Sequence, residues 1–261
     1  MATIEPVQSL HKDKLTVNIY HNDSQMGNAA AGVVVNKLQS AIAEKGSANL
    51  ILATGASQFS FLNALRDADL DWQKIIVFHL DEYKDMSDQH PASFRKYLRE
   101  RILDHVQPFQ VHYLEGDAKD IDAEIHRYES LLRSHPVDVA CIGIGENGHI
   151  AFNDPPVADF NDPHLVKVVE LDEPCRQQQL GEGWFGSLAE VPTHALSLTI
   201  PAIMNCRFIS CVVPDERKAD AVYNTLNGPV ATACPASILR THANAILYLD
   251  QASAKRIWNN D

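Results

Sequence analysis

The segment VDVACIGIGENGHIAFNDPP, residues 137–156, carries the clearest indication of the fold in this chain. Its first six residues are mostly apolar and partly β-branched, which predicts a strand that is buried on both faces, as in a parallel sheet. Three glycines follow in the spacing G-x-G-x-x-G, at Gly143, Gly145 and Gly148. At the carboxyl end of a parallel strand, such a loop either binds a dinucleotide or carries other ligand-binding side chains.

A dinucleotide site requires a helix that begins directly after this loop. Glu170 lies at the distance at which such sites place an acid, about 20 residues on. However, Gly148 is followed by HIAFNDPP, so a helix starting there would meet two prolines after two turns. Each proline costs about 3 kcal/mol in a helix interior. The sequence therefore favours a strand-end loop with other chemistry, in which His149 and Asp154 are the reactive side chains.

The rest of the chain alternates short apolar runs with longer amphipathic segments, which is typical of βαβ units. Strands are predicted over residues 15–21, 49–55, 74–82, 110–116, 137–145, 194–200, 207–214 and 245–250. Helices are predicted over residues 26–46, with Gly46 as the C-cap, and over 57–68, 91–106, 122–135 and 215–228. This pattern predicts one α/β domain, residues 1–261, with a mostly parallel sheet and helices on both faces.

Residues 155–191 fit neither a helix nor a strand pattern. They contain several prolines and the glycine-rich GEGWFG. A long irregular stretch within a compact domain is usually functional, so a lid-like segment is expected here.

The amino-acid composition bears on the kind of ligand that the protein binds and on the compartment in which it is found. The chain has 22 Lys and Arg against 34 Asp and Glu, a net charge of −12, which argues against binding nucleic acid but allows one small phosphate ligand. Its 5 cysteines form no C-x-x-C pair, which favours reduced thiols in a cytoplasmic protein over disulfides or a zinc site. No 18-residue apolar run and no apolar leader segment occur, so neither membrane insertion nor export is predicted.

A second strand-end loop, LATGAS, contains Thr54, Gly55, Ala56 and Ser57 just before a predicted helix. Hydroxyl groups and free amides at a helix N-terminus can hold an anion without any lysine. The alternative is an ordinary turn in which Ser57 serves as an N-cap.

A third loop, VFHLDEY, places Asp81 and Glu82 at the mouth of the predicted sheet. Partial burial would raise the pKa of Asp81 and suit it to act as a general base, and a solvated loop carboxylate is the alternative. His149 could shuttle protons near neutral pH or be a hydrogen-bonded structural imidazole. A metal held by His149, Asp154 and Asp81 is disfavoured because no pair has the spacing H-x-x-x-H, and no metal is predicted.

Four groups of motifs together resemble the glucosamine-6-phosphate deaminase/isomerase family, which shares its fold with the 6-phosphogluconolactonases: LATGAS, FHLDEY with HPASF, GIGENGHIAFNDP, and HALSLTIPAIM with DERKADAV. The resemblance runs from about residue 14 to 250, with the motifs in family order. It implies a modified doubly wound α/β sheet, in agreement with the strand pattern. It also implies a sugar phosphate as the small-molecule ligand, and it is compatible with a homo-oligomer.

The resemblance assigns roles to individual residues. It implies catalytic roles for Asp81, His149, Asn147 and Asp154, and substrate-binding roles for Thr54, Gly55, Ala56, Ser57, Glu82, Gly148, Arg176 and Lys218. In the implied reaction His149 moves a proton between O5 and O1 as the sugar ring opens, and Asp81 takes the proton at C2. An enolamine is then reprotonated at C1, and loss of ammonia leaves fructose 6-phosphate. No metal, nicotinamide or pyridoxal cofactor is implied, because the open-chain aldehyde already acidifies C2.

Several positions depart from the family pattern. Asn147 stands where the family usually has Asp, and Asp154 where it has Glu. Asn147 cannot supply a negative charge to the imidazole, which predicts a weaker acid-base role for His149. An Asn at this position also resembles the galactosamine-phosphate branch, which leaves the configuration at C4 open. In the lid-like segment Arg176 lies a few residues earlier than the family's phosphate-binding Arg, and QQQ at 177–179 with WF at 184–185 predicts a neutral, hydrogen-bonding wall.

Two alternatives to a deaminase follow from these observations. A 6-phosphogluconolactonase-like hydrolase usually reads His-Thr-Ala-Ser after the glycine, whereas this chain reads HIAF at 149–152. A non-catalytic sugar-phosphate sensor of the same fold is supported by Asn147, and is opposed by the presence of Asp81, His149 and Lys218.

Overall fold

A central eight-stranded sheet dominates the computed structural model, which describes residues 4–258. In spatial order its strands are β1 (Gln8–Lys12), β2 (Leu15–Tyr20), β11 (Ala245–Asp250), β10 (Phe208–Val213), β7 (Val139–Ile142), β3 (Ala48–Leu52), β4 (Ile75–His79) and β6 (Gln110–His112). All neighbours pair in parallel except β1, which pairs with β2 antiparallel at the sheet edge.

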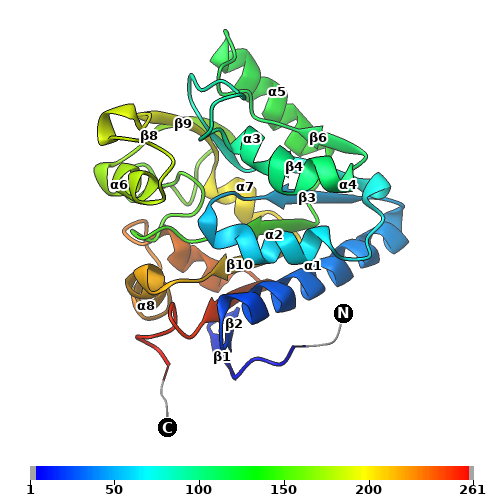
Figure 1. Cartoon of the computed structure of the whole chain (residues 1–261), viewed down its shortest axis with the longest axis vertical. Coiled ribbons are helices and arrows are strands. Elements are labelled where there is room, and N and C mark those ends of the chain that lie inside the picture. The colour runs from blue at the N-terminus through cyan, green and yellow to red at the C-terminus, as the bar shows by residue number, and fades with distance from the viewer. Residues whose placement is uncertain (1–3, 259–261) are drawn as a thin grey trace.

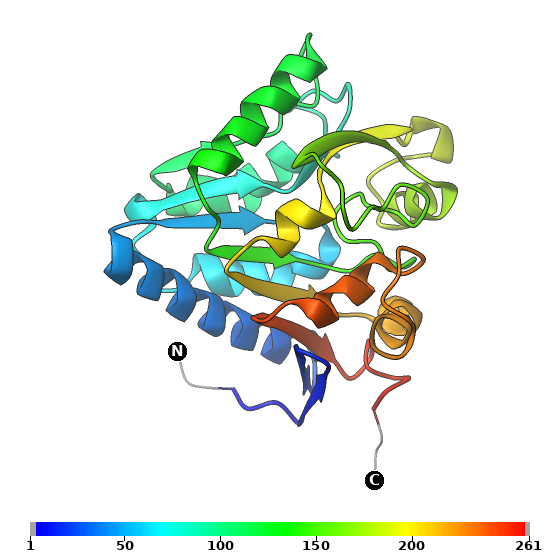
Figure 2. The ribbon, with the colours of Figure 1, turned by 180° about the vertical axis from the view of Figure 1, so that it is seen from behind.

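Helices cover both faces of this sheet (Figures 1 and 2). One face carries α1 (Asp23–Lys45), α2 (Phe59–Arg66), α3 (Phe94–Leu98) and α4 (Asp104–Val106), and a π-helical turn, Arg99–Leu103, joins the last two. The other face carries α5 (Ile121–Ser134) and α7 (Ile200–Met204). Beyond the carboxyl ends of the strands lie α6 (Glu173–Gly181) and α8 (Ala219–Asn227).

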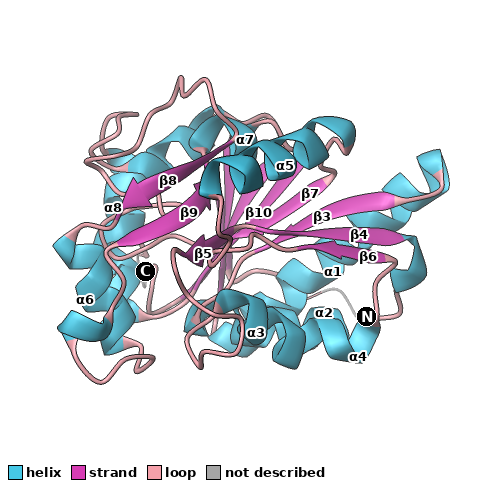
Figure 3. Cartoon of the chain, turned by 90° about the horizontal axis from the view of Figure 1, so that it is seen from above, coloured by secondary structure: helices cyan, strands magenta, loops and turns pink. Residues whose placement is uncertain are grey.

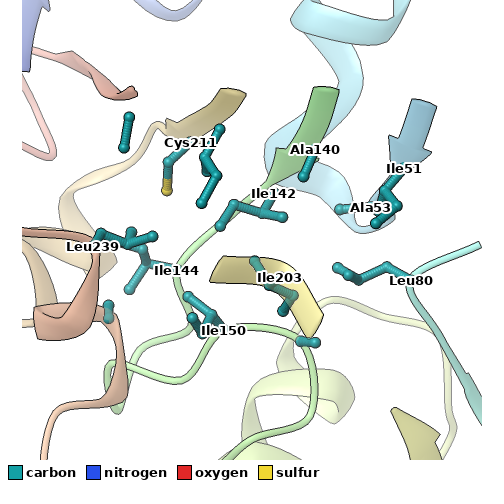
Figure 4. Packing of buried hydrophobic residues seen from close by; sticks show 14 of the residues in the cluster. Ile51, Ala53, Leu80, Ala140, Ile142, Ile144, Ile150, Ile203, Cys211 and Leu239 are labelled. Atoms are coloured by element: carbon teal, nitrogen blue, oxygen red, sulfur yellow. The ribbon is translucent and has the colours of Figure 1, made fainter. Parts of the chain in front are cut away.

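Alternation along β7 explains why the central strands are apolar throughout. Val139 and Cys141 pack against the α1 side of the sheet, whereas Ala140 and Ile142 pack against the opposite side. Figure 4 shows this second layer, where Ile142 lies close to Ile203 of α7. Because successive side chains of a strand point to opposite faces, a strand between two helical layers needs apolar residues at every position.

The predicted carboxyl end of the first long helix is confirmed, whereas the helix begins at Asp23, three residues before the predicted start at Met26. Asn22 caps the amino end of α1 by accepting a hydrogen bond from the backbone N of Gln25 at 2.9 Å. Gly46 closes the carboxyl end with φ of 84°, a left-handed conformation that favours glycine.

The predicted fold class, a mostly parallel α/β sheet with helices on both faces, is also confirmed, with one correction. Residues 194–200 were expected in the main sheet, but they form β9 (His194–Leu198) of a separate antiparallel sheet. That sheet has the order β5-β9-β8, with β5 (Asp81–Tyr83) and β8 (Val166–Glu170) at its edges (Figure 3). The predicted strand 74–82 therefore ends at His79, and the chain crosses into the second sheet at Asp81.

Two strands and two α-helices were not anticipated, and one of these helices is α7, which follows β9. The antiparallel edge strand β1 precedes the first predicted strand. Residues 155–191 contain β8, α6 and a 3₁₀ turn, Leu188–Glu190. Among residues 4–258 no helix is long and apolar enough to cross a membrane.

The strand order reverses at the centre of the sheet, and this reversal fixes where a ligand can bind. From β3 the chain adds β4 and β6 on one side, and it then returns to add β7 next to β3 and β10 beyond it. The loops that follow β3 and β7 therefore lead away from each other and leave a crevice at the carboxyl ends of the strands.

Candidate active site

Six of the residues predicted from the sequence line one cavity in this crevice. They come from loops at the ends of four neighbouring strands: Thr54, Gly55 and Ser57 after β3, Asp81 after β4, His149 after β7, and Lys218 after β10. The fold thus brings together side chains that are as far apart as 164 positions (218 − 54) in the sequence.

Asp81 lies at the base of the cavity, where the chain leaves the main sheet. Its side chain is 6% exposed, and among the described residues it has no hydrogen-bond partner within the protein. Burial, and secondly the charge of Glu82, raises the pKa of Asp81 to about 8. A carboxylate that faces a cavity without protein donors has high proton affinity, which suits a general base.

Glu82 points to the opposite side of β5 and is fully buried. Its carboxylate accepts hydrogen bonds from the Ser93 hydroxyl at 2.8 Å and from the Arg95 backbone N at 3.0 Å, and it pairs with the Arg95 guanidinium at 3.3 Å. These contacts fix β5 against the start of α3 and thereby hold Asp81 in place. Glu82 does not line the cavity, so its position supports a structural role and not the expected contact with substrate.

His149 pairs with a buried carboxylate. Its Nδ1 lies 2.7 Å from Oδ1 of Asp154, and the Asp154 side chain is completely buried. Burial alone would raise the pKa of Asp154, but the contacts with His149 and Asn147 outweigh it and hold that pKa below its usual value. An ionised Asp154 therefore orients the ring and leaves Nε2 as the nitrogen available for proton transfer.

Asn147 supports this pair from behind and does not line the cavity that contains Asp81. Its Oδ1 accepts a hydrogen bond from the His149 backbone N at 3.0 Å, and its Nδ2 donates to Oδ1 of Asp154 at 2.9 Å. The same Nδ2 lies 3.3 Å from a carboxylate oxygen of Asp172. The amide thus sits between two carboxylates, and Asp154 itself supplies the negative charge that Asn147 lacks.

We expect Asn147→Asp to lower activity, although it restores the residue that the family usually carries. The new carboxylate would lie within hydrogen-bond distance of Asp154 and Asp172, and three carboxylates so close repel one another. Losing a donor to the buried Asp154 and the half-buried Asp172 should also destabilise the fold by about 1–3 kcal/mol at pH 8. Steady-state kinetics and urea unfolding at pH 8 check this. Wild-type stability together with raised kcat would contradict it.

Two glycines of the G-x-G-x-x-G sequence shape the loop around His149. A Cβ added to Gly145 would lie 2.1 Å from Cε1 of the imidazole, so only glycine leaves room for the ring. Gly148 has φ of 85°, and a Cβ there would lie 2.8 Å from the sulfur of Cys234. Gly148 consequently turns the chain but does not line the cavity. No helix follows these glycines up to β8, which agrees with the preference for a strand-end loop over a dinucleotide site.

Lys218 is a buried cation that faces the cavity. Lys218 is 4% exposed. Among the described residues no carboxylate oxygen lies within 4.0 Å of its ammonium group. Burial lowers the pKa of Lys218, while the nearby carboxylates of Glu182 and Glu146 act in the opposite direction. Burying a charge without an ion-pair partner is costly, so a lysine in this position is typical of an anion-binding site.

The structure does not bring all predicted residues to this cavity. Ala56 lines a neighbouring hollow together with Ser57. Arg176 points into the lid-like segment, where its Nη2 donates to the carbonyl oxygens of Leu188 at 2.6 Å and Val191 at 2.9 Å. Arg176 therefore closes a loop of the segment and leaves the cavity without the second cation that the sequence predicted.

Three residues of the lid-like segment line the cavity: Gln178, Gln179 and Glu182. The first two belong to the QQQ run that predicted a neutral wall. Gln178 accepts a hydrogen bond from the Glu146 backbone N at 2.8 Å, and Gln179 accepts one from the Tyr83 hydroxyl at 2.7 Å. Glu182 had no signal in the sequence, because a Glu beside a glycine in an irregular segment resembles an exposed loop residue.

One group of side chains offers the donor atoms of a metal site. His149, Asp154 and Cys175 are all buried, and their ligand atoms lie within 4.8 Å of one another. However, burial, and secondly the charge of Asp154, raises the pKa of Cys175 far above its ordinary value, so a metal would have to displace the thiol proton before the sulfur could bind it. The thiol lies beside Asp154, with its sulfur within 4.8 Å of a carboxylate oxygen. The arrangement fits a chain of polar groups from α6 to the imidazole better than a metal centre.

Comparison with known proteins gives a consistent result. The family described as glucosamine-6-phosphate isomerases/6-phosphogluconolactonase matches residues 21–248. A glucosamine-6-phosphate deaminase from Exiguobacterium sp. is 36% identical over 233 residues, which cover 89% of this chain and 90% of that relative. Another from Bacillus cytotoxicus is 35% identical over 236 residues, which cover 90% and 87% of the two chains.

Solved structures agree. That of a monomeric glucosamine-6-phosphate deaminase is similar with a TM-score of 0.83 and 30% identity, over 92% of this chain and 98% of the other. A 6-phosphogluconolactonase from Trypanosoma brucei is similar with a TM-score of 0.75 over 96% and 100% of the two chains. At 17% sequence identity, this similarity supports a shared fold but not a shared activity.

Proposed function

Because the chain belongs to the family of glucosamine-6-phosphate isomerases and 6-phosphogluconolactonases, we propose that it is an amino-sugar-phosphate deaminase. Its substrate is glucosamine 6-phosphate or a close isomer such as the galacto form, and its products are the matching ketose 6-phosphate and ammonia. The reaction takes place in the cytoplasm, a location that suits the free cysteines of the described residues.

The proposal is carried by the convergence of three different groups on one cavity. Asp81 supplies a base whose pKa is raised to about 8, His149 supplies an oriented imidazole, and Lys218 supplies a buried cation. A sugar phosphate that opens, loses a proton from carbon and is held at its far end needs one group of each kind.

The first step opens the sugar ring. We assign to His149 the transfer of a proton from the O1 hydroxyl to the ring oxygen O5, which breaks the C1–O5 bond and leaves a free aldehyde. Asp154 keeps the ring of His149 in one orientation, so that Nε2 faces the cavity. Lys218 and the loop Thr54–Ser57 hold the phosphate of the substrate.

The second step moves a hydrogen from C2 to C1. The Asp81 carboxylate takes the proton at C2, whose electron pair forms the C1–C2 double bond of an enolamine, and His149 protonates O1. Asp81 then returns its proton to C1, which gives an iminium at C2, and this iminium returns one N–H proton to His149 and becomes a neutral imine. Water adds to this imine and ammonia leaves, so the sugar exchanges its C2 nitrogen for oxygen without net oxidation or reduction.

The direct test is release of ammonia together with ketose 6-phosphate from purified protein. Glucosamine 6-phosphate, galactosamine 6-phosphate and 6-phosphogluconolactone are assayed side by side. Turnover of one amino sugar supports the proposal and identifies the C4 configuration. Hydrolysis of the lactone alone would overturn it in favour of a lactonase. If the protein turns over none of the three compounds but the sugar phosphates raise its Tm, the result would favour a sensor.

The pH dependence of kcat/KM should follow the ionisation of the Asp81 carboxyl group. This parameter reflects the free enzyme, and Asp81 must be ionised to act as a base, so kcat/KM should rise tenfold per pH unit below about pH 8 and level off above it. The amino group of the substrate also titrates, so the carboxyl ¹³C shift of Asp81 is followed in the free protein as well. A carboxyl group that titrates near pH 4 would contradict this assignment.

A further inference from the structure

A lid carboxylate faces the end of the cavity assigned to phosphate. Glu182 follows the last residue of α6, and its Oε2 lies 3.7 Å from the position that a Cβ would take on Gly55. The same side chain lines both the catalytic cavity and the neighbouring hollow, and Lys218 lines both with it. Glu182 therefore approaches the anion-binding loop and the buried lysine at once.

This carboxylate is held in position from its own helix. Nε2 of Gln178 donates to Oε1 of Glu182 at 3.0 Å, and the Glu182 backbone N donates to the Gln178 carbonyl oxygen at 2.9 Å. Among the described residues no cation lies within 4.0 Å of the carboxylate. The charge of Glu182 is consequently not neutralised by an ion pair of its own, and its electrostatic influence falls on Lys218 and on Arg217, which lines the neighbouring hollow.

The side-chain charges at this end of the cavity then cancel. Lys218 contributes one positive charge and Glu182 one negative charge, while Arg176 is directed away into the lid-like segment. A phosphate dianion that enters this space meets a like charge beside its binding loop. Like charges at such distances in a partly buried site repel strongly.

We propose that Glu182 is a built-in competitor of the substrate phosphate. Its carboxylate and the phosphate compete for the field of Lys218 and the Thr54–Ser57 loop, so binding of phosphate requires the end of α6 to move the carboxylate away. Glu182 thereby weakens phosphate binding and couples it to displacement of the lid-like segment. This inference rests on the proposed function, because it assigns the Lys218 end of the cavity to phosphate.

Glu182→Gln tests the competition with minimal change in shape. The glutamine keeps an Oε1 that can accept the hydrogen bond from Gln178, so α6 should retain its end. Inorganic phosphate is the probe, and its Kd is measured by calorimetry at constant ionic strength for the wild type and the variant. We expect Kd to fall about tenfold or more, because one repelling charge is removed. KM for the sugar phosphate should fall as well, without a rise in kcat.

Glu173→Gln is the matched control. It removes the same charge from the exposed start of the same helix, outside the cavity, and should leave the Kd for phosphate unchanged. An unchanged or higher Kd in Glu182→Gln would overturn the inference, as would absence of phosphate binding in every variant. Tighter phosphate binding without ammonia release from any amino sugar would sink the proposed function alone and leave the competitor role intact.

Discussion

Asp81→Asn is expected to lower kcat by about 10³-fold or more and to leave the Kd for inorganic phosphate unchanged. General base catalysis contributes roughly 10²–10⁴ to rates, and no neighbouring carboxylate can replace Asp81. Glu82 is bound on the other side of the strand to Arg95, and Asp154 is bound to His149. Asn keeps the size of the side chain but cannot take the proton at C2.

The same variant is expected to be more stable than the wild type at high pH. The folded-state pKa of Asp81, about 8, lies above the ordinary value of 3.8. The contribution of this group to stability is therefore fully present below pH 3.8 and is lost as the pH rises through 8. Asparagine never ionises, so the free energy of unfolding of the variant should exceed that of the wild type by about 1 kcal/mol or more at pH 9.

Two measurements check this variant. Ammonia release gives kcat, and urea unfolding at pH 5 and pH 9 gives the difference in stability. Asp85→Asn serves as a control, because Asp85 is exposed, and its φ of 62° is one that asparagine tolerates. Retention of more than a tenth of the wild-type kcat in Asp81→Asn would exclude Asp81 as the base.

Lys218→Met is expected to weaken binding of inorganic phosphate by about 100-fold, because it removes a charge-assisted contact from the only cation that lines the cavity within residues 4–258. KM for the sugar phosphate should rise by a similar factor. The free energy of unfolding should not fall, since the methionine spares the protein the cost of burying an unpaired charge.

Arg217→Met is the matched control for this charge. Arg217 is the preceding residue, its side chain is 49% exposed, and it pairs with Asp215 at 2.9 Å. Its removal should change the Kd for phosphate by less than about threefold, because exposed ion pairs are screened by solvent. Equal effects of the two variants would mean that Lys218 acts through general surface charge and does not contact the phosphate.

The sequence predicted the main sheet well, because each central strand carries its own apolar signal. The second sheet escaped prediction for a physical reason. Its strand β5, Asp81–Tyr83, has three residues and follows β4 after a single residue, so a local pattern reads both as one strand. β8 pairs with β9 across residues 171–193, which show no regular pattern in the sequence. This pairing depends on tertiary contacts, so the local periodicity of the sequence does not predict it.

In the site, the residues that could be predicted are those placed by strand ends. Asp81 lies at the end of a predicted strand, His149 and Lys218 follow one, and parallel strands bring their carboxyl ends together. Glu182 and Cys175 could not be found in this way. They reach the site through the packing of α6, a helix that has few apolar residues and whose position depends on contacts such as that between Gln179 and Tyr83.

The position of β11 has a consequence for synthesis of the chain. In the main sheet β2 pairs in parallel with β11, the last strand in chain order within the described residues. During vectorial translation the hairpin of β1 and β2 must wait until β11, which ends at Asp250, has left the ribosome before it can dock. The nascent chain thus exposes an unpaired strand edge while all the intervening residues are synthesised, which makes it a candidate for chaperone engagement.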